Sequence, residues 1–317
     1  MDGSRNSNEL MAQTWARVGA LWGGVTPDAA ARFTALEIAV TRVRGQSWVP
    51  EQGALAVLIA DWWTQQQGRA AQTQLVLGVS GAQGTGKSTL VAHLASALAN
   101  LGQRVAVLSL DDLYLSHAAR AQLAVAVHPL LATRGVPGTH DVESGLRLLD
   151  ALAQNGDVPL PRFDKASDDP APLSSWPVVQ APCDTVLLEG WCVGIPPQDM
   201  NPLRIPCNTL EQNEDPRGIW REFVNAQLAT RYAPLFARCA KLIALLPPDF
   251  AAIQRWRGWQ EQGLPQEKRM NDASLARFVA HYERLTRHGI AMLPERADVV
   301  IRLAADHTIA AIGHRPV

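Results

Sequence analysis

A glycine-rich segment, GVSGAQGTGKSTL at residues 78–90, has the residue types of a loop that wraps phosphate groups. It fits the pattern G-x-x-x-x-G-K-[ST], whose fixed positions are Gly81, Gly86, Lys87 and Ser88. The glycines let the backbone turn so that successive N–H groups point inward at an anion. We expect Lys87 to reach the β- and γ-phosphates of a nucleotide and the Ser88 hydroxyl to ligate Mg²⁺, which prefers hard oxygen ligands.

The nucleotide contacts are expected along the whole loop, because a helix that begins at such a loop also points its first N–H groups at phosphate. The residues concerned are Gly81, Ala82, Gln83, Gly84, Thr85, Gly86, Lys87, Ser88 and Thr89. A GTPase would carry an N-K-x-D segment that reads the guanine base, and this chain has none. The sequence therefore favours ATP, together with Mg²⁺, as the bound nucleotide.

Acidic residues follow two other apolar runs. Asp111 and Asp112 end the run in LSLDDLYL, and Glu189 ends the run in TVLLEG. A small-molecule kinase needs a carboxylate beside the acceptor hydroxyl, to orient it and accept its proton, and Asp111 or Asp112 could supply it. A motor ATPase would use such a carboxylate to hold Mg²⁺ and position water. An acidic pair can also cap the next helix, as we expect of Asp112, while Glu189 is expected to contact Mg²⁺ directly or through water.

These residues need a scaffold that brings them to one edge. Helical segments separate most of five short apolar runs, which are LVLGVS, RVAVLSL, DTVLLEG, KLIALLP and ADVVIRL. The alternation predicts an α/β fold with a parallel sheet of about five strands flanked by helices. Ligands of such sheets bind at the carboxyl ends of the strands. The glycine-rich loop, the pair Asp111 and Asp112, and Glu189 each follow one of these runs, so we expect them to meet at one edge.

The chain is expected to have two parts. In residues 1–70 apolar positions recur at helical spacing, which predicts an N-terminal helical extension that Trp62 and Trp63 pack onto the rest. Residues 71–317 are predicted to form the catalytic domain. Within it residues 128–182 are rich in Pro, Gly and charge and look irregular; loops this long are usually functional or disordered.

Composition restricts the function classes. Lys and Arg number 29 against 30 Asp and Glu, and the net charge of −1 offers no broad basic field for nucleic acid or an anionic membrane. The four cysteines show no C-x-x-C spacing, which favours reduced thiols. No apolar stretch approaches the ~18 residues of a membrane span, and the N-terminus does not read as a signal peptide. We expect a soluble, cytoplasmic protein, monomeric or weakly self-associating, that binds a small-molecule substrate.

Six segments together resemble a known family. They occur in this order: GVSGAQGTGKSTL, LSLDDLYL, HPLLATRGVPGTHD, VPLPRFDKASDDPAP, SSWPVV and VLLEGWCVG. They resemble the plant-type D-glycerate 3-kinases and their fungal and bacterial relatives, within the phosphoribulokinase, uridine kinase and pantothenate kinase group of P-loop kinases. The resemblance runs from about residue 75 to 303. It implies a P-loop NTPase-type fold and transfer of the γ-phosphate of ATP to the 3-hydroxyl of D-glycerate.

The resemblance also implies residue roles. It puts Asp111 at the position of the catalytic base, but the group often has Ser at the next position, where this chain has Asp112, so the base stays open between the two. The plant segment PRYNKS corresponds here to PRFDKAS, so its Tyr and Asn are replaced. In related kinases the segment after the fourth strand forms a lid whose arginines reach the phosphates. We expect this lid at about residues 250–272, with Arg257 as the catalytic cation and Arg255 as the alternative.

Glycerate is a small carboxylate with two hydroxyls, so its pocket should offer cations and polar groups. The planar fork of arginine suits a carboxylate well. The candidate substrate-binding residues are Asp112, Tyr114, Arg134, His140, Asp141, Arg162, Asp164 and Lys165.

Two other function classes fit the same residues. A kinase of the same fold could act on a nucleoside or a pantothenate-like metabolite. A P-loop ATPase could use hydrolysis to regulate a partner protein, with residues 1–70 as the docking surface. The ATPase class is separable by assay, because a kinase turns over rapidly only with its acceptor, whereas a partner-driven ATPase ignores small acceptors.

Overall fold

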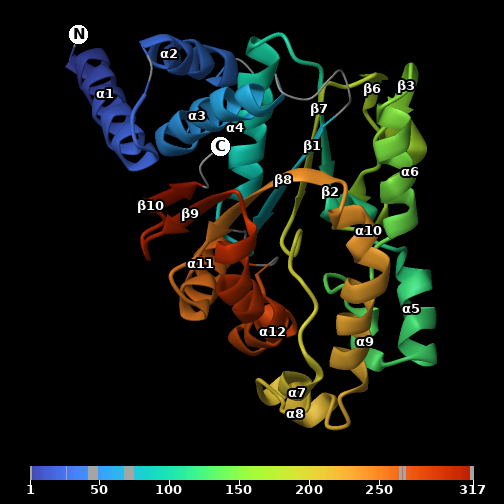
Figure 1. Ribbon diagram of the computed structural model, residues 1–317. Coiled ribbons are helices and arrows are strands. Elements are labelled where there is room, and N and C mark those ends of the chain that lie inside the picture. Colours follow the sequence, from blue (N-terminus) through green and yellow to red (C-terminus); the bar gives the residue numbers. More distant parts are fainter. Residues whose placement is uncertain are drawn as a thin grey trace.

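The computed structural model describes residues 2–25, 27–41, 49–67, 75–263, 266 and 269–314. Within these ranges a six-stranded sheet lies at the centre of the molecule (Figure 1). Across the sheet the strands are β10 (Ile309–His314), β9 (Val299–Leu303), β8 (Cys239–Leu246), β1 (Leu75–Gly81), β7 (Thr185–Gly190) and β2 (Val105–Ser109). Neighbours from β9 to β2 are parallel, and β10 is antiparallel to β9. The predicted strands and the mostly parallel sheet are confirmed.

The antiparallel edge strand β10 is absent from the sequence prediction. It follows β9 through a tight turn, in which the Ala304 N–H donates to the Thr308 carbonyl at 2.8 Å. His307 adopts a left-handed backbone there, with φ of +71°. Because no helix separates β9 from β10, the alternation of strand and helix that indicates the other strands gives no signal for this one.

Three helices precede the sheet and confirm the predicted helical extension. They are α1 (Asp2–Trp22), α2 (Pro27–Thr41) and α3 (Pro50–Gln67). α3 packs along α4 (Lys87–Asn100), the helix that follows the glycine-rich loop (Figure 1). Trp62 and Trp63 are buried, as predicted. The Trp63 indole Nε1 donates to the Thr185 hydroxyl on β7 at 2.8 Å, which fastens the extension to the sheet.

The first turn of α3 also touches the glycine-rich loop. Gln52 is buried, and a Cβ added to Gly86 would lie 3.0 Å from its Nε2. Just before α3, the Val49 N–H donates to His93 Nε2 on α4 at 3.2 Å. The predicted boundary near residue 70 falls in residues 68–74, outside the described ranges, so the division into two parts stays a prediction.

Helices cover both faces of the sheet, because successive side chains of a strand point to opposite faces. On β1, Leu77 and Val79 pack with α3 and α4, whereas Val76 packs on the other face. That second face is covered by α6 (Val142–Leu152), α9 (Ile219–Gln227), α10 (Ala233–Phe236) and α12 (Asp272–Arg296). Burial on both faces explains why the strands read as nearly continuous apolar runs.

Residues 128–182 are more regular than their composition predicts. They contain α6 and two small antiparallel strand pairs, which are β3 (Gly156–Pro159) with β6 (Val178–Ala181) and the hairpin of β4 (Phe163–Asp164) with β5 (Asp169–Pro170). A sequence signal for α6 exists: Asp141 precedes it and caps it, accepting a hydrogen bond from the Ser144 N–H at 2.9 Å. The interpretation as an irregular loop is therefore wrong for much of this segment.

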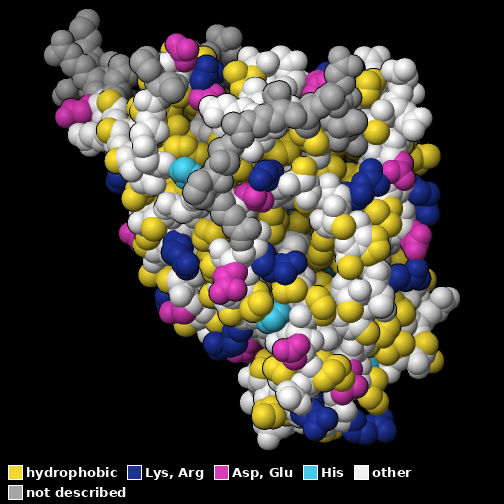
Figure 2. Space-filling view, in the orientation of Figure 1, with side chains coloured by type: hydrophobic (Ala, Val, Ile, Leu, Met, Phe, Trp, Pro, Cys, Tyr) yellow, Lys and Arg dark blue, Asp and Glu magenta, His cyan; other side chains and the backbone are white. Residues whose placement is uncertain are grey.

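The remaining elements are short or lie near the cleft described below. The α-helices among them are α5 (His117–Ala126), α7 (Met200–Leu203), α8 (Thr209–Glu214) and α11 (Phe250–Gln262). The 3-10 helices are η1 (Leu110–Leu113), η2 (Pro129–Ala132) and η3 (Leu173–Ser175), and η4 (Leu228–Tyr232) is a π-helical turn. No helix in the described ranges is long and apolar enough to cross a membrane. Figure 2 shows basic and acidic side chains interspersed on one face.

Candidate active site

A cleft of about 720 Å³ lies where the glycine-rich loop faces the end of β2. The loop residues predicted to bind the nucleotide, from Gly81 to Thr89, all line it. Of the other predicted site residues, those that line the cleft are Asp111, Tyr114, Arg134, Lys165 and Arg257. The structure thus brings together residues from five separate segments. Their parts in catalysis and binding stay predictions.

The glycine-rich loop has the backbone shape that its residue types predict. β1 ends at Gly81 and α4 begins at Lys87. Gly84 and Gly86 have φ of +81° and +80°, a left-handed conformation that side chains disfavour. A Cβ at Gly81 would lie 2.7 Å from the Thr85 hydroxyl oxygen. Glycine is therefore required at all three positions, and the α4 N-terminus faces the cleft as a phosphate site needs.

Lys87 and Glu189 form an ion pair at the base of the loop. Lys87 Nζ donates to Glu189 Oε2, and Glu189 Oε1 accepts a hydrogen bond from the Ser109 hydroxyl at 2.8 Å. The Ser88 hydroxyl lies 3.5 Å from the same oxygen, Oε1. A hydroxyl and a carboxylate side by side fit Mg²⁺, which is held by few protein oxygens and otherwise by phosphates and water. The described residues contain no cluster of three or more His, Cys, Asp or Glu suited to a metal.

Asp111 faces the cleft and is held from two sides. Its carboxylate accepts hydrogen bonds from the Tyr114 hydroxyl at 2.9 Å and from Lys165 Nζ at 2.7 Å. Partial loss of solvent raises the pKa of Asp111, but the charge and hydrogen bond of Lys165, with smaller effects of Lys87 and Tyr114, outweigh it. The pKa of Asp111 is consequently below its ordinary value. The carboxylate stays ionised, as a proton acceptor must.

The carboxylate of Asp112, unlike that of Asp111, binds the segment at the start of the β4–β5 hairpin. Its Oδ1 accepts the Phe163 N–H at 3.1 Å and its Oδ2 accepts Arg162 Nη1 at 3.3 Å. Burial raises the pKa of Asp112, in contrast to that of Asp111. The expectation that Asp112 caps the next helix is wrong, because the Ser116 hydroxyl caps α5. Asp112 instead fastens the start of the β4–β5 hairpin to the end of β2.

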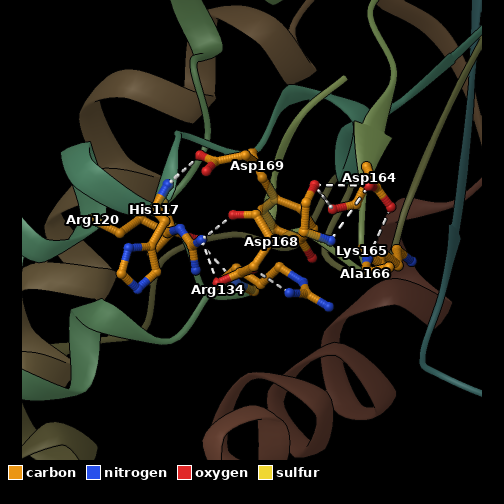
Figure 3. A network of polar contacts seen from close by, with 12 residues as sticks. His117, Arg120, Arg134, Asp164, Lys165, Ala166, Asp168 and Asp169 are labelled. Carbon is orange, nitrogen blue, oxygen red and sulfur yellow. Dashed lines mark hydrogen bonds and ion pairs between the residues drawn. The ribbon is translucent and has the colours of Figure 1, made fainter. Parts of the chain in front are cut away.

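The β4–β5 hairpin carries a network of ion pairs into the cleft (Figure 3). Asp168 accepts Arg120 Nη2 at 2.8 Å and also pairs with Arg134. Lys165, in the same turn, extends to Asp111. At the base of the turn, Asp169 accepts the His117 backbone N–H at 2.8 Å, which links the hairpin to α5.

Besides Asp112, four of the predicted substrate residues do not line the cleft. Asp141 caps α6, and Arg162 donates to Asp112 and to the Pro161 carbonyl. Asp164 is exposed, and its carboxylate accepts the Ala166 N–H at 2.9 Å and closes the hairpin turn. His140 is buried, which lowers its pKa to about 3, and its ring stacks on Tyr114 with centroids 4.5 Å apart. These residues support the cleft wall, and their contact with substrate stays a prediction.

Arg257 reaches the cleft from α11, the first part of the predicted lid. Its Nη2 lies 2.5 Å from Glu261 Oε1, and its guanidinium lies 5.1 Å from the centre of the Phe278 ring. Arg255, the alternative lid cation, is exposed and does not line the cleft. The lid is expected over residues 250–272, of which 264, 265, 267 and 268 lie outside the described residues.

Sequence reasoning missed several residues that line the cleft. They include His117, Arg120, Asp168, Trp191, Phe278 and Tyr282. Trp191 Nε1 donates to the Gly135 carbonyl at 2.8 Å, and the Tyr282 hydroxyl donates to the Arg134 carbonyl at 3.2 Å. The sequence gives one hint of these contacts, which is Gly135 within HPLLATRGVPGTHD. The residues that meet there are far apart in the chain, so no local pattern indicates their contacts.

Gly135 gives a prediction about stability. Its φ is +136°, and an added Cβ would lie 2.1 Å from the Tyr282 hydroxyl. Gly135→Ala is expected to lower the free energy of unfolding by about 2–4 kcal/mol, since backbone strain and steric overlap add. Urea unfolding measures this, with Gly156→Ala as the control, whose φ is +144° and which has no atom within 4 Å. Equal losses in the two variants would show that Tyr282 moves aside without cost.

Comparison with known proteins gives both sequence and structural similarity. A family model described as "Methylmalonyl Co-A mutase-associated GTPase MeaB" matches residues 37–116, a short segment that contains the glycine-rich loop. The chain is 36% identical over 219 residues to "Uncharacterized kinase mug58" of Schizosaccharomyces pombe; the match covers 65% of this chain and 78% of that protein. It is 30% identical over 220 residues to the chloroplastic D-glycerate 3-kinase of Arabidopsis thaliana. That match covers 66% of this chain but 46% of the plant protein.

Among solved structures, the D-glycerate 3-kinase of Cryptococcus neoformans var. grubii superposes with a TM-score of 0.68. The superposition covers 83% of this chain and 99% of the fungal one, at 23% sequence identity. At this identity the likeness shows a shared fold. It extends beyond the glycine-rich loop to most of the chain.

Proposed function

We propose a specific reaction for this chain, which belongs to the family of P-loop small-molecule kinases that includes mug58 and D-glycerate 3-kinase. It transfers the γ-phosphoryl group of ATP to the 3-hydroxyl of D-glycerate and forms 3-phosphoglycerate. The observation that carries this proposal is the pairing of Asp111 with an excess of cations in one cleft. The lining residues include five cations, which are Lys87, Arg120, Arg134, Lys165 and Arg257, and two carboxylates, which are Asp111 and Asp168.

The cations divide between the two substrates. Lys87 and Arg257 lie with the glycine-rich loop and α11, where they neutralise charge on the nucleotide phosphates. Arg134 and Lys165 belong with the β4–β5 hairpin, on the side of Asp111. An uncharged acceptor would add no anion to a cleft whose cations outnumber its carboxylates, and the excess positive charge disfavours its binding. The cleft therefore suits an acceptor that carries its own negative charge.

The roles follow from the atoms in the cleft. The backbone of the loop and Lys87 hold the phosphates, while Ser88 and Glu189 offer the oxygens that fit Mg²⁺. A Mg²⁺ ion held by these oxygens would supply neutralisation of the phosphate charge. Asp111 orients the acceptor hydroxyl and accepts its proton, with Tyr114 fixing the carboxylate. Asp112 and Arg162 hold the hairpin in place behind Asp111.

A nucleoside acceptor is less well matched, although aromatic rings line the cleft. Base recognition needs an exposed ring face. Tyr114 is stacked on His140, and Trp191 and Tyr282 pack edge to face with centroids 5.0 Å apart. Arg257 lies over the Phe278 ring. These rings build the wall by contacts with one another and with cations.

D-glycerate is expected to be phosphorylated with a kcat/KM at least about 100-fold above that of glycerol, which lacks the carboxylate. An assay of ADP release over hydroxy acids, polyols and nucleosides measures the ratio, and mass spectrometry identifies 3-phosphoglycerate. ATP hydrolysis without an acceptor is the control and should be slow. Equal rates with glycerol and glycerate, or faster turnover of uridine than of both, would overturn the proposal. ATP hydrolysis that no acceptor accelerates would instead indicate a partner-driven ATPase.

A further inference from the structure

We infer that Arg134 receives the carboxylate of the acceptor, and that Asp168, fixed by the buried Arg120, positions Arg134 for this task. This inference rests on the proposed function in one respect, that the acceptor is an anion. It adds Asp168 and Arg120 to the site, and it selects Arg134 from the arginines that the sequence indicates. Arg120, Asp168 and Arg134 together form an arginine–aspartate bridge.

Arg120 is the fixed end of the bridge. Its side chain is 1% exposed, and each of its three guanidinium nitrogens already donates a hydrogen bond. Nε donates to the Leu115 carbonyl at 3.1 Å, Nη1 to the Ala132 carbonyl at 3.1 Å, and Nη2 to the main-chain carbonyl of Asp168 at 2.9 Å. A buried charge needs such complete pairing. Arg120 is thus engaged by the protein itself and serves to hold Asp168.

Asp168 joins the two arginines. Its Oδ2 accepts Arg120 Nη2 at 2.8 Å, and its Oδ1 accepts Arg134 Nη1. Its backbone has φ of +58°, which aspartate tolerates better than most residues. Partial burial raises the pKa of Asp168, but its hydrogen bonds to Arg120 and Arg134 outweigh this and keep the pKa low. Two cations share one carboxylate, so the bridge keeps one net positive charge.

Arg134 is the open end of the bridge. Its side chain is 30% exposed, and it lies 5.5 Å from the centre of the Phe163 ring. Within the described part of the chain, the one hydrogen bond from its guanidinium is that of Nη1 to Asp168. Nε and Nη2 remain for a ligand, and such a guanidinium edge binds a carboxylate through two hydrogen bonds. Asp168 and Phe163 hold the fork in one orientation, which reduces the entropy lost on binding.

The bridge belongs to the acceptor side of the cleft. Asp168 and Lys165 lie in the same hairpin turn (Figure 3). Lys165 Nζ donates to the Asp111 carboxylate. A carboxylate held by Arg134 therefore directs the rest of a small acceptor toward Asp111. Arg162 lies in the adjacent segment but donates to Asp112 and to its own neighbour's carbonyl. The Arg162 charge is thus already paired with Asp112, which does not line the cleft.

The test compares KM values for the two substrates. Arg134→Met is expected to raise KM for D-glycerate about 100-fold, with KM for ATP and the slow turnover of glycerol changed less than about two-fold. Arg134→Lys, which keeps the charge but loses the fork, should fall between wild type and Arg134→Met. The matched control is Arg238→Met, which breaks a surface pair with Asp150 of 2.7 Å and should leave all constants unchanged.

Asp168→Asn tests the positioning role. It keeps the size of the side chain and removes its charge, and it is expected to raise KM for D-glycerate about 10-fold. A purely structural defect would also slow glycerol turnover and raise KM for ATP, so unchanged values there identify positioning. Thermal unfolding of each variant shows that the fold is retained.

The outcomes separate this inference from the proposed function. If wild type phosphorylates D-glycerate but Arg134→Met keeps a normal KM for it, the inference is overturned and the proposed function stands. If Arg134→Met raised KM for ATP alone, the inference would also be overturned, because Arg134 would then bind the phosphates. If Arg162→Met alone raised KM for D-glycerate, the carboxylate would be assigned to Arg162. If wild type prefers another hydroxy acid and Arg134→Met loses that acid, the inference holds and the proposed function fails.

Discussion

Replacing Lys87 with alanine is expected to abolish phosphoryl transfer, with kcat at least about 10³-fold lower, because a fixed cation that stabilises charge in the transition state is lost. The side chain of Lys87 is 14% exposed and its partner is Glu189, so it lies in the cleft and outside the apolar core. The fold should therefore persist. Steady-state kinetics with circular dichroism measure both parts of this expectation.

The matched control for Lys87→Ala is Lys241→Ala. Lys241 also pairs with a carboxylate, that of Asp298 at 3.0 Å, but it does not line the cleft. Lys241→Ala should keep normal turnover. If Lys87→Ala kept near-normal turnover, the assignment of the loop to phosphate binding would be wrong. If it unfolded the protein, the more conservative Lys87→Gln would replace it in the same assay.

Asp111→Asn is expected to lower kcat by about 10²–10⁴-fold with little change in KM for ATP, since a positioned base contributes a factor of this size. Asp112→Asn should have a smaller effect on kcat, because its carboxylate holds Phe163 and Arg162 behind the cleft. Rates at saturating acceptor and ATP measure both variants. The reverse ranking would move the base to Asp112.

The pH profile checks the same assignment. A base must be deprotonated to act, and Lys165 keeps the pKa of Asp111 below its ordinary value. The acid limb of kcat/KM should accordingly lie below the ordinary range of an aspartate, with activity retained as the pH falls toward that range. Asp112 has a pKa that burial raises. An acid limb above the ordinary range would therefore favour Asp112 as the base.

The sequence could predict features that depend on local pattern. The glycine-rich loop needs glycine at particular backbone angles, and the parallel strands must be apolar because both faces are buried. The position of Asp111 in the cleft was predictable because it follows β2 at the edge of the sheet where ligands bind. The matches to known kinases confirm the predicted kinase class. β10 escaped prediction because a turn, and no helix, joins it to β9.

Features that depend on the direction of a side chain could not be predicted. Arg134 and Arg162 both lie in polar segments, yet Arg134 faces the cleft and Arg162 faces Asp112. Arg134 pairs with Asp168 in the β4–β5 turn, whereas Arg162, which precedes β4, donates to Asp112. The pair of Arg120 and Asp168 joins positions 48 residues apart, and no local periodicity marks it. The sequence shows that these residues are charged, but it does not show which residues form their ion pairs.

The contact between Gln52 and Gly86 makes the first helices part of the nucleotide site in a thermodynamic sense. Gly86 directly precedes Lys87, the residue proposed to bind phosphate, and Gln52 packs against Gly86 from α3. A nucleotide that binds only the ordered loop stabilises that loop by its binding free energy, in addition to the packing of α3 on it. Nucleotide binding and the docking of α3 are thus linked equilibria, each of which favours the other. A substitution on the buried face of α3 would change nucleotide affinity without touching the nucleotide.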